Sequence, residues 1–362
     1  MTDSKSGPLA GCRIVEFDAI GPVPLAGMIL SDLGAEIVRI GRPGKSGVDA
    51  PGNKVLLRGR SHVALDLKDE AQRDRALDLV ARADGLIEGA RPGVMERLGL
   101  GPEDCFARNP KLAYGRMTGW GQEGPLSQSA GHDLDYIAIT GALGAMGKKG
   151  EPPMPPLNLV GDYGGGTMFL CLGLVSAILS ARQTGKGQVI DAAMTDGASV
   201  LMSMFYAFHD AGFWTAEREA NLLDGGTPFY RCYECSDGHH VAVGPLEPQF
   251  FAVLLEKLGL DPAEFPQHDR ARWPAMTAAL TEKFASRTRD AWAAHFEGSD
   301  ACVAPVLSIA EAPAHPHNVA RKTFAEHDGT MQPMPAPRFS ETPAAIGTSE
   351  TIAIEDALAR WG

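Results

Sequence analysis

The amino-acid sequence predicts an α/β protein built on a parallel sheet. Strand-like and helix-like segments alternate from Gly11 to Leu98, and a helical crossover is the usual connection between two parallel strands. The chain has 362 residues, of which 44% are hydrophobic and 22% charged. A chain of this length can bury a large core and divide into more than one compact unit, so we expect a large α/β domain and a smaller second domain.

The first part of the chain is expected to contain two rounds of this alternation. In the first round, residues 12–17 form a strand, 23–33 a helix and 36–40 a second strand. In the second, a strand at 63–67 precedes a helix at 70–83, a strand at 85–88 and a short helix at 93–98. The turn after the first strand lacks the three-glycine dinucleotide motif, and the phosphate-binding loop of nucleotide triphosphatases is absent, which disfavours an NAD- or ATP-binding fold.

The rest of the chain is expected to continue with helices and then to form a β-hairpin followed by further helices. Two long apolar segments, 164–182 and 191–213, are predicted to be largely buried helices. Residues 230–234 and 239–243 flank a Ser-Asp-Gly turn and predict a β-hairpin. Further helices are expected at 248–258, 273–285, 289–296 and 355–361.

The charge of the chain restricts its partners. The formal net charge of −12 argues against binding to nucleic acid. An anionic ligand must therefore be held by a local basic cluster, and residues 39–60 offer one, with six basic side chains and one acidic. This segment is a candidate for phosphate binding, although a solvated basic loop explains the same composition equally well.

Cysteine usage and hydropathy indicate the compartment. No apolar run reaches the roughly 18 residues that a membrane-spanning helix needs, so we expect no membrane association and a cytoplasmic location. The six cysteines are scattered and are expected to be reduced thiols. The pair Cys232 and Cys235 lacks a second Cys/His pair at zinc spacing, which argues against metal or redox use there.

A histidine and an aspartate at element boundaries are the candidate catalytic pair. His132 lies in Gly131-His132-Asp133, and Asp162 precedes the apolar segment 164–182. Histidine titrates near neutral pH unaided, whereas aspartate needs its environment to tune it. From the residues alone, a satisfied loop histidine and an ordinary helix N-cap aspartate are the stronger interpretations.

Several longer strings resemble one family of proteins. They are residues 15–17 with 33–40, 91–99, 117–125, 131–133 and 191–194. Over nearly its whole length the sequence resembles the α-methylacyl-CoA racemases, members of the family III CoA-transferase superfamily. Most of these strings resemble the CoA-transferases as well, whereas Gly131-His132-Asp133 resembles the racemase branch.

The resemblance implies a reaction and roles for individual residues. The reaction is the interconversion of (2R)- and (2S)-2-methylacyl-CoA thioesters by removal and return of the α-proton through an enolate. His132 and Asp162 would be the two acid/base groups, with Asp133 as a supporting residue. Glu247 matches the family's small-domain glutamate, which pairs with the catalytic histidine across a dimer interface. No metal or cofactor is implied, because CoA is part of the substrate.

The resemblance also implies an architecture and a binding surface. The protein would be an interlocked homodimer with a Rossmann-like large domain at 1–222 and 320–362 and a small α+β domain at 223–319. A methionine-rich acyl surface would consist of Met146, Met168, Met194 and Met202. The residues that would bind the CoA part are Arg42, Arg58, Arg60, Leu65, Asp66, Leu67, Lys68, Glu88, Gly89, Arg91, Arg97, Gly131, Asp133, Leu134, Asp135 and Tyr136.

The sequence leaves two other functions open. In a family III CoA-transferase, the carboxylate of Asp162 would form a covalent anhydride and then a thioester, and His132 would be superfluous. In a CoA-thioester binding protein without catalysis, the basic segment would suffice. The acyl chain is also open, because branched fatty acids, sterol side chains and aryl-propionates share the same C2 centre.

Overall fold

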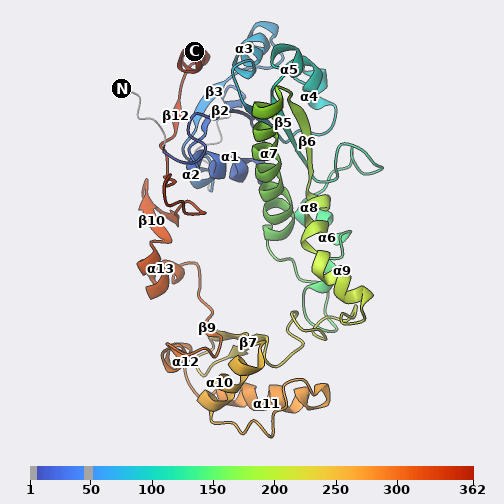
Figure 1. Ribbon diagram of the computed structural model, residues 1–362, viewed down its shortest axis with the longest axis vertical. Helices are drawn as coiled ribbons and strands as arrows, with labels where there is room; N and C mark the ends of the chain where they lie inside the picture. The colour runs from blue at the N-terminus through green and yellow to red at the C-terminus, as the bar shows by residue number, and fades with distance from the viewer. Residues whose placement is uncertain (1–5, 45–51) are drawn as a thin grey trace. The chain divides into compact units, whose positions relative to one another are not determined.

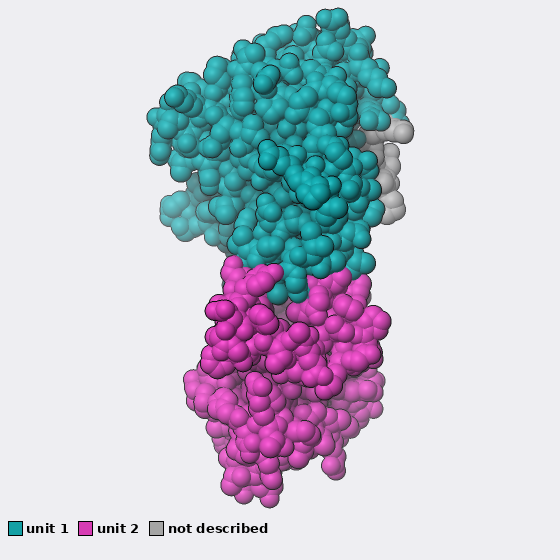
Figure 2. Space-filling model, turned by 90° about the vertical axis from the view of Figure 1, so that its right-hand side faces the viewer, with its two compact units in different colours: residues 1–142, 156–202, 319–362 teal, residues 143–155, 203–318 magenta. Residues whose placement is uncertain are grey.

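The computed structural model describes residues 6–44 and 52–362, and the chain divides into two compact units (Figures 1 and 2). Unit 1 comprises Met1–Ala142, Pro156–Met202 and Val319–Gly362, and unit 2 comprises Leu143–Pro155 and Ser203–Asn318. Residues 143–155 and 203–222 therefore cluster with unit 2, although the resemblance assigns both segments to the large domain.

Unit 1 is built on a parallel sheet whose described strands follow the order β12-β3-β2-β1-β4-β5-β6. Every neighbouring pair in this sheet runs parallel, which confirms the predicted α/β class. The strand order reverses between β1 and β4, because the chain adds β2 and β3 on one side and β4 to β6 on the other. The strands are β1 (Arg13–Phe17), β2 (Glu36–Gly41), β3 (Ser61–Ala64), β4 (Gly85–Glu88), β5 (Ala113–Thr118), β6 (Gln188–Ala193) and β12 (Glu350–Thr351).

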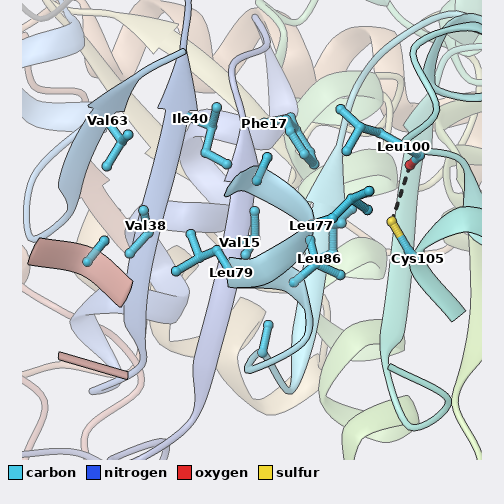
Figure 3. Close-up of a cluster of buried hydrophobic side chains, with 14 of the residues drawn as sticks. Val15, Phe17, Val38, Ile40, Val63, Leu77, Leu79, Leu86, Leu100 and Cys105 are labelled. Atoms are coloured by element: carbon cyan, nitrogen blue, oxygen red, sulfur yellow. Dashed lines mark hydrogen bonds between the residues drawn. The ribbon is translucent and has the colours of Figure 1, made fainter. Parts of the chain in front are cut away.

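Helices cover both faces of this sheet. On one face, α1 (Pro22–Asp32) and α7 (Met168–Thr184) pack on the strands through a core that includes Leu30 and Leu174. On the other face, α3 (Glu70–Val80), α5 (Pro102–Arg108) and α14 (Ile354–Trp361) close a second core. Figure 3 shows this second core, in which the Cys105 thiol donates a hydrogen bond to the Leu100 carbonyl at 3.4 Å. The shorter helices of unit 1 are α2 (Asn53–Leu56), α4 (Val94–Arg97), α6 (Asp133–Ala138) and α8 (Met194–Leu201).

The segment after Asn158 differs from the two uninterrupted helices that we expected. It begins with a π-helix, η2 (Leu159–Thr167), which continues directly into α7. The expected helix over 191–213 is wrong, because its first residues belong to β6, which pairs along its whole length with β5 at the edge of the sheet. The remainder divides into α8 and α9 (Ser203–Asp210).

The combined helix Leu159–Thr184 corrects a further expectation. With 26 residues, it is long and apolar enough to cross a membrane by length and composition, whereas we had expected no segment of that length. Half of its apolar window is buried inside the protein, as in the core helix of a globular fold.

Unit 2 has its own sheet and core. Strands β7 (Arg231–Glu234) and β8 (His240–Val243) form the predicted hairpin, and β9 (Val303–Pro305) pairs antiparallel with β8. The aromatic side chains of Phe284 and Trp292 lie in the centre of this core. The helices are α10 (Pro248–Leu258), α11 (Trp273–Phe284) and α12 (Arg289–Phe296). Helix α13 (Pro316–Arg321) spans the point at which the chain returns to unit 1, and the antiparallel pair β10 (Phe324–His327) and β11 (Thr330–Pro333) belongs to unit 1.

Candidate active site

A crevice of about 660 Å³ lies at the carboxyl ends of β1, β2 and β4 in unit 1. Its walls include Phe17 at the end of β1, Gly41 at the end of β2 and Glu88 at the end of β4. The strand order reverses between β1 and β4, and ligands of open α/β sheets bind outside the carboxyl ends of the strands at such a switch point. The crevice is therefore the expected ligand site of this sheet.

A second pocket, of about 510 Å³, adjoins this crevice and also lies within unit 1. Ile20, Gly89 and Ala90 line both hollows, so the two are neighbours along one wall. His132 and Asp162, 30 positions apart in the sequence, both line the second pocket. A ligand in the crevice can thus reach an imidazole and a carboxyl group in the adjoining pocket.

The backbone around His132 is held by local hydrogen bonds. His132 is the N-cap residue of α6, and its own amide donates to the carboxylate of Asp135 at 2.9 Å. The Tyr136 hydroxyl donates to the Gly131 carbonyl, and its ring packs edge-on against Trp120 with 4.9 Å between ring centroids. These contacts fix the main chain, while the exposed imidazole lines the pocket.

Asp162 lies inside the π-helix rather than at a helix N-cap. The N-cap of η2 is Asn158 and that of α7 is Thr167, so the helix-cap interpretation of Asp162 is wrong. The Asn158 side-chain amide donates to Asp162 Oδ2 at 3.1 Å, and the Asp162 amide donates to Asp133 Oδ1 at 2.6 Å. π-helical segments inside helices often occur at functional sites, and this nine-residue segment carries the carboxyl group that lines the pocket.

The surroundings of Asp162 favour its protonated form. Burial raises the pKa of the Asp162 carboxyl above its ordinary value, and the negative charge of Asp133 acts in the same direction. The hydrogen bond from Asn158 and the charge of a protonated His132 oppose this shift in pKa. A carboxyl group with a raised pKa keeps a protonated fraction at higher pH, as a proton donor requires.

The structure brings about half of the predicted CoA-binding residues to the two hollows. Arg42 is exposed at the crevice, and burial raises the pKa of the Glu88 carboxyl there to about 7 against the pull of the Ala90 amide and the Arg116 guanidinium. The predicted residues that line the crevice are Arg42, Asp66, Leu67, Lys68, Glu88 and Gly89, and those that line the pocket are Gly89, Arg91, Gly131 and Tyr136.

Two predicted phosphate ligands are instead engaged inside the fold. Arg58 is 3% exposed and donates to both carboxylate oxygens of Asp32, at 3.1 and 2.5 Å. Arg60 is 1% exposed and donates to both carboxylate oxygens of Glu16, at 2.7 and 2.9 Å. Arg39, at the start of the basic segment, forms ion pairs with Glu16 and Asp18. Much of the basic segment thus neutralises buried carboxylates.

The other predicted CoA-binding residues lie outside the lining of both hollows. Leu65 is buried in the core, Leu134 is 45% exposed on α6, and Arg97 is exposed at the end of α4. Met194 lines the pocket, whereas Met168 is 53% exposed on α7 and Met202 follows α8. Met146 and Glu247 belong to unit 2, and residues 45–51 of the basic segment lie outside the described residues.

Asn158 is the functional neighbour that sequence reasoning missed. It stands four positions before Asp162, the spacing that puts two side chains on one face of a helix. We had started the helix at residue 164, so the pairing was not considered. All six cysteines are free, and the described residues contain no group of three His, Cys, Asp or Glu side chains that could hold a metal ion.

Fold and pocket together define an α/β protein with a crevice at the switch point of its sheet and with an imidazole and a carboxyl group in the pocket beside it. The comparison with known families makes this specific. A model of CoA-transferase family III matches residues 9–351, so the chain belongs to CoA-transferase family III.

Individual relatives agree with this assignment. The chain is 45% identical to the α-methylacyl-CoA racemase of Mus musculus and 42% identical to that of Homo sapiens, over 93% of this chain and 87% of each relative. Among solved structures, a CAIB/BAIF family protein from Brucella suis superimposes with a TM-score of 0.82 at 25% identity, covering 98% of this chain and 99% of that chain.

Proposed function

We propose that this protein is an α-methylacyl-CoA racemase that interconverts (2R)- and (2S)-2-methylacyl-CoA thioesters. The observation that carries the proposal is the position of His132 and Asp162, which line one pocket beside the switch-point crevice. The names of the two mammalian relatives support the same reaction.

The chemistry of inversion explains why two such groups are needed. A proton on the carbon next to a thioester is weakly acidic, so a base must lie within reach as the enolate forms. The two enantiomers present this proton to opposite faces of the planar enolate, so inversion needs one acid/base group on each face. His132 would remove or return the proton on one face and Asp162 on the other. The raised pKa of Asp162 brings its titration closer to that of an imidazole.

The crevice would hold the CoA part of the substrate. Arg42 and Lys68 bring positive charge to its wall, and an arginine fork can bind two phosphate oxygens. Met194 lines the pocket and would contact the acyl chain with a flexible apolar surface. A 1,1-proton transfer is redox-neutral, so we propose no cofactor beyond the CoA of the substrate.

The active form would be a homodimer with shared sites. Met168, Leu172, Val175 and Leu179 form an apolar stripe along α7, each at least 36% exposed. Their spacing of four, three and four residues is that of a helix face that packs on another helix. We propose that a second copy covers this face and that its Glu247 contacts His132. Light scattering should give twice the mass of one chain.

One experiment separates the racemase from its alternatives. The protein is incubated with (2R)-2-methylacyl-CoA in deuterated water, and α-deuterium and optical rotation are followed. A racemase exchanges the α-proton and loses optical activity, whereas a CoA-transferase moves CoA to an added free acid and a binding protein does neither. His132→Ala and Asp162→Ala should each slow exchange by roughly 100-fold or more. His317→Ala, an exposed histidine of α13, should not.

A further inference from the structure

The start of the π-helix leaves main-chain amides without helical partners. In η2, the Tyr163 amide donates to the Asn158 carbonyl at 3.3 Å, which is a bond to the fifth preceding residue. The amide of Asp162 precedes that bond, so no residue of the helix can accept from it. A buried amide without an acceptor costs about 1–3 kcal/mol, so another part of the fold must supply one.

Asp133 supplies the missing acceptor from 29 positions away in the sequence. It is the first residue of α6 and is 8% exposed. Its Oδ1 accepts from the Asp162 amide at 2.6 Å, a short, charge-assisted bond. Gly161 allows this approach, because a Cβ atom on Gly161 would lie 2.5 Å from the same oxygen. Gly161 thus leaves space for the Asp133 carboxylate, and the Asp162 amide donates a hydrogen bond to it.

We propose that Asp133 is a positioning residue that fixes the π-helical turn and thereby sets where the Asp162 carboxyl group enters the pocket. The inference rests on the proposed racemase function, since it deepens the role of Asp162 in that reaction. Asp133 acts through Asp162, by holding its main chain on one side while Asn158 holds its side chain on the other.

The charges around Asp162 allow this role to be measured. Among the described residues, the titratable groups that act on its carboxyl group are Asp133 and His132, while burial and then the charge of Asp162 raise the pKa of Tyr136. All three residues lie on α6 or at its N-cap. Asp191 of β6 is engaged elsewhere, since it accepts from the Gln122 amide at 3.0 Å. Arg91, which follows β4, brings a positive charge to the same pocket, whereas the lining neighbours from α1 and α8, Pro22 and Met194, are uncharged.

Two substitutions at one position separate the hydrogen bond from the charge. Asp133→Ala removes the acceptor, and we expect kcat for α-proton exchange to fall about 10- to 100-fold, as for a misplaced catalytic group, with KM nearly unchanged. Asp133→Asn keeps an oxygen of the same size that can accept from the Asp162 amide. This variant should retain most of kcat. The limb of its pH–rate profile that reports Asp162 should move to lower pH, because a neighbouring negative charge is lost.

Gly161→Ala tests the same contact without altering Asp133. Its added methyl group would push the carboxylate away, and we expect the kcat loss of Asp133→Ala with an unshifted KM. Asp104→Ala, which removes the carboxylate that accepts from the Gly101 amide at the start of α5, is the matched control and should leave kcat unchanged.

Three results would overturn the inference: an Asp133→Ala enzyme with wild-type kcat, an Asp133→Asn enzyme as impaired as Asp133→Ala at every pH, or an unshifted pH limb in Asp133→Asn. Failure of the proposed function itself looks different, because the wild-type protein would then exchange no α-proton. If Asp133→Ala does not fold, as judged by thermal unfolding, Asp133→Asn and Gly161→Ala decide the matter.

Discussion

Replacing Gly165 by alanine should disable the enzyme without touching a reacting group. Gly165 lies in η2, three residues after Asp162, and packs directly on the backbone of α8. A Cβ atom there would lie 2.6 Å from the Ala198 amide nitrogen and 2.9 Å from the Met194 carbonyl oxygen. Neither main-chain atom can rotate away, so η2 and α8 must separate by about 0.8 Å, the difference between 2.6 Å and an ordinary 3.4 Å contact.

The expected loss follows from this displacement. A shift of about 1 Å in a catalytic group can cost about 100-fold, so a shift near 0.8 Å should lower kcat by a few tens-fold. Overpacking should also cost about 1–3 kcal/mol of stability, against a gain in helix propensity of about 1 kcal/mol for alanine over glycine. The assay is α-deuterium exchange by NMR, with thermal unfolding to verify the fold. Gly144→Ala is the control, because nothing lies within 4 Å of its added Cβ. A Gly165→Ala enzyme with wild-type kcat would refute the reasoning.

Three further substitutions test other parts of the structure. Asn158→Leu removes a hydrogen bond that lowers the pKa of Asp162, so the pH limb assigned to Asp162 should move to higher pH, and a fixed limb would contradict this. Arg60→Met removes the buried Nη1 group that donates to both carboxylate oxygens of Glu16 and should cost about 3–5 kcal/mol of unfolding free energy in urea, whereas a loss below about 1 kcal/mol would contradict this. If each active site combines residues of two copies, co-expressed His132→Ala and Glu247→Ala chains should recover about a quarter of wild-type activity. Random pairing makes half of the dimers mixed, and each mixed dimer has one intact site of two. No recovery would indicate that each site lies within one chain.

The sequence predicted the strands and helices of the first βαβ rounds because their patterns are local. Residues 37–40 and 85–88 are buried without interruption, as expected for strands of a sheet covered on both faces. The strand at residues 188–193 was not predicted, because the burial of β6 changes from exposed to buried along the strand. Its pairing with β5 depends on tertiary contact rather than on a local pattern. The π-helix could not be predicted either, because the contacts that accompany it join residues far apart in the sequence. Gly165 packs on α8, and the Asp162 amide donates to Asp133.

Part of the candidate site could also be predicted from the sequence, and part could not. His132 and Asp162 could be nominated from sequence through their resemblance to a family, and both line one pocket. The basic segment, residues 39–60, was predicted less well as a phosphate site, because composition counts charged residues but does not show their ion-pair partners. The carboxylates that bind Arg58 and Arg60 are 26 and 44 positions away. Only the fold reveals that these arginines are interior residues.

The path of the chain through the sheet of unit 1 has a consequence for synthesis. Strand β12 pairs with β3, Arg58 donates to Gln332 and the Pro333 carbonyl, and Trp361 belongs to the same buried core as Leu79. A ribosome delivers these last segments only after all of unit 2 has emerged. Unit 2 can therefore complete its core first. The N-terminal part of unit 1, although synthesised earlier, still has β3 as an unpaired edge strand at that point. A released chain that ends at residue 318 should therefore resist protease better within residues 203–318 than within residues 6–142.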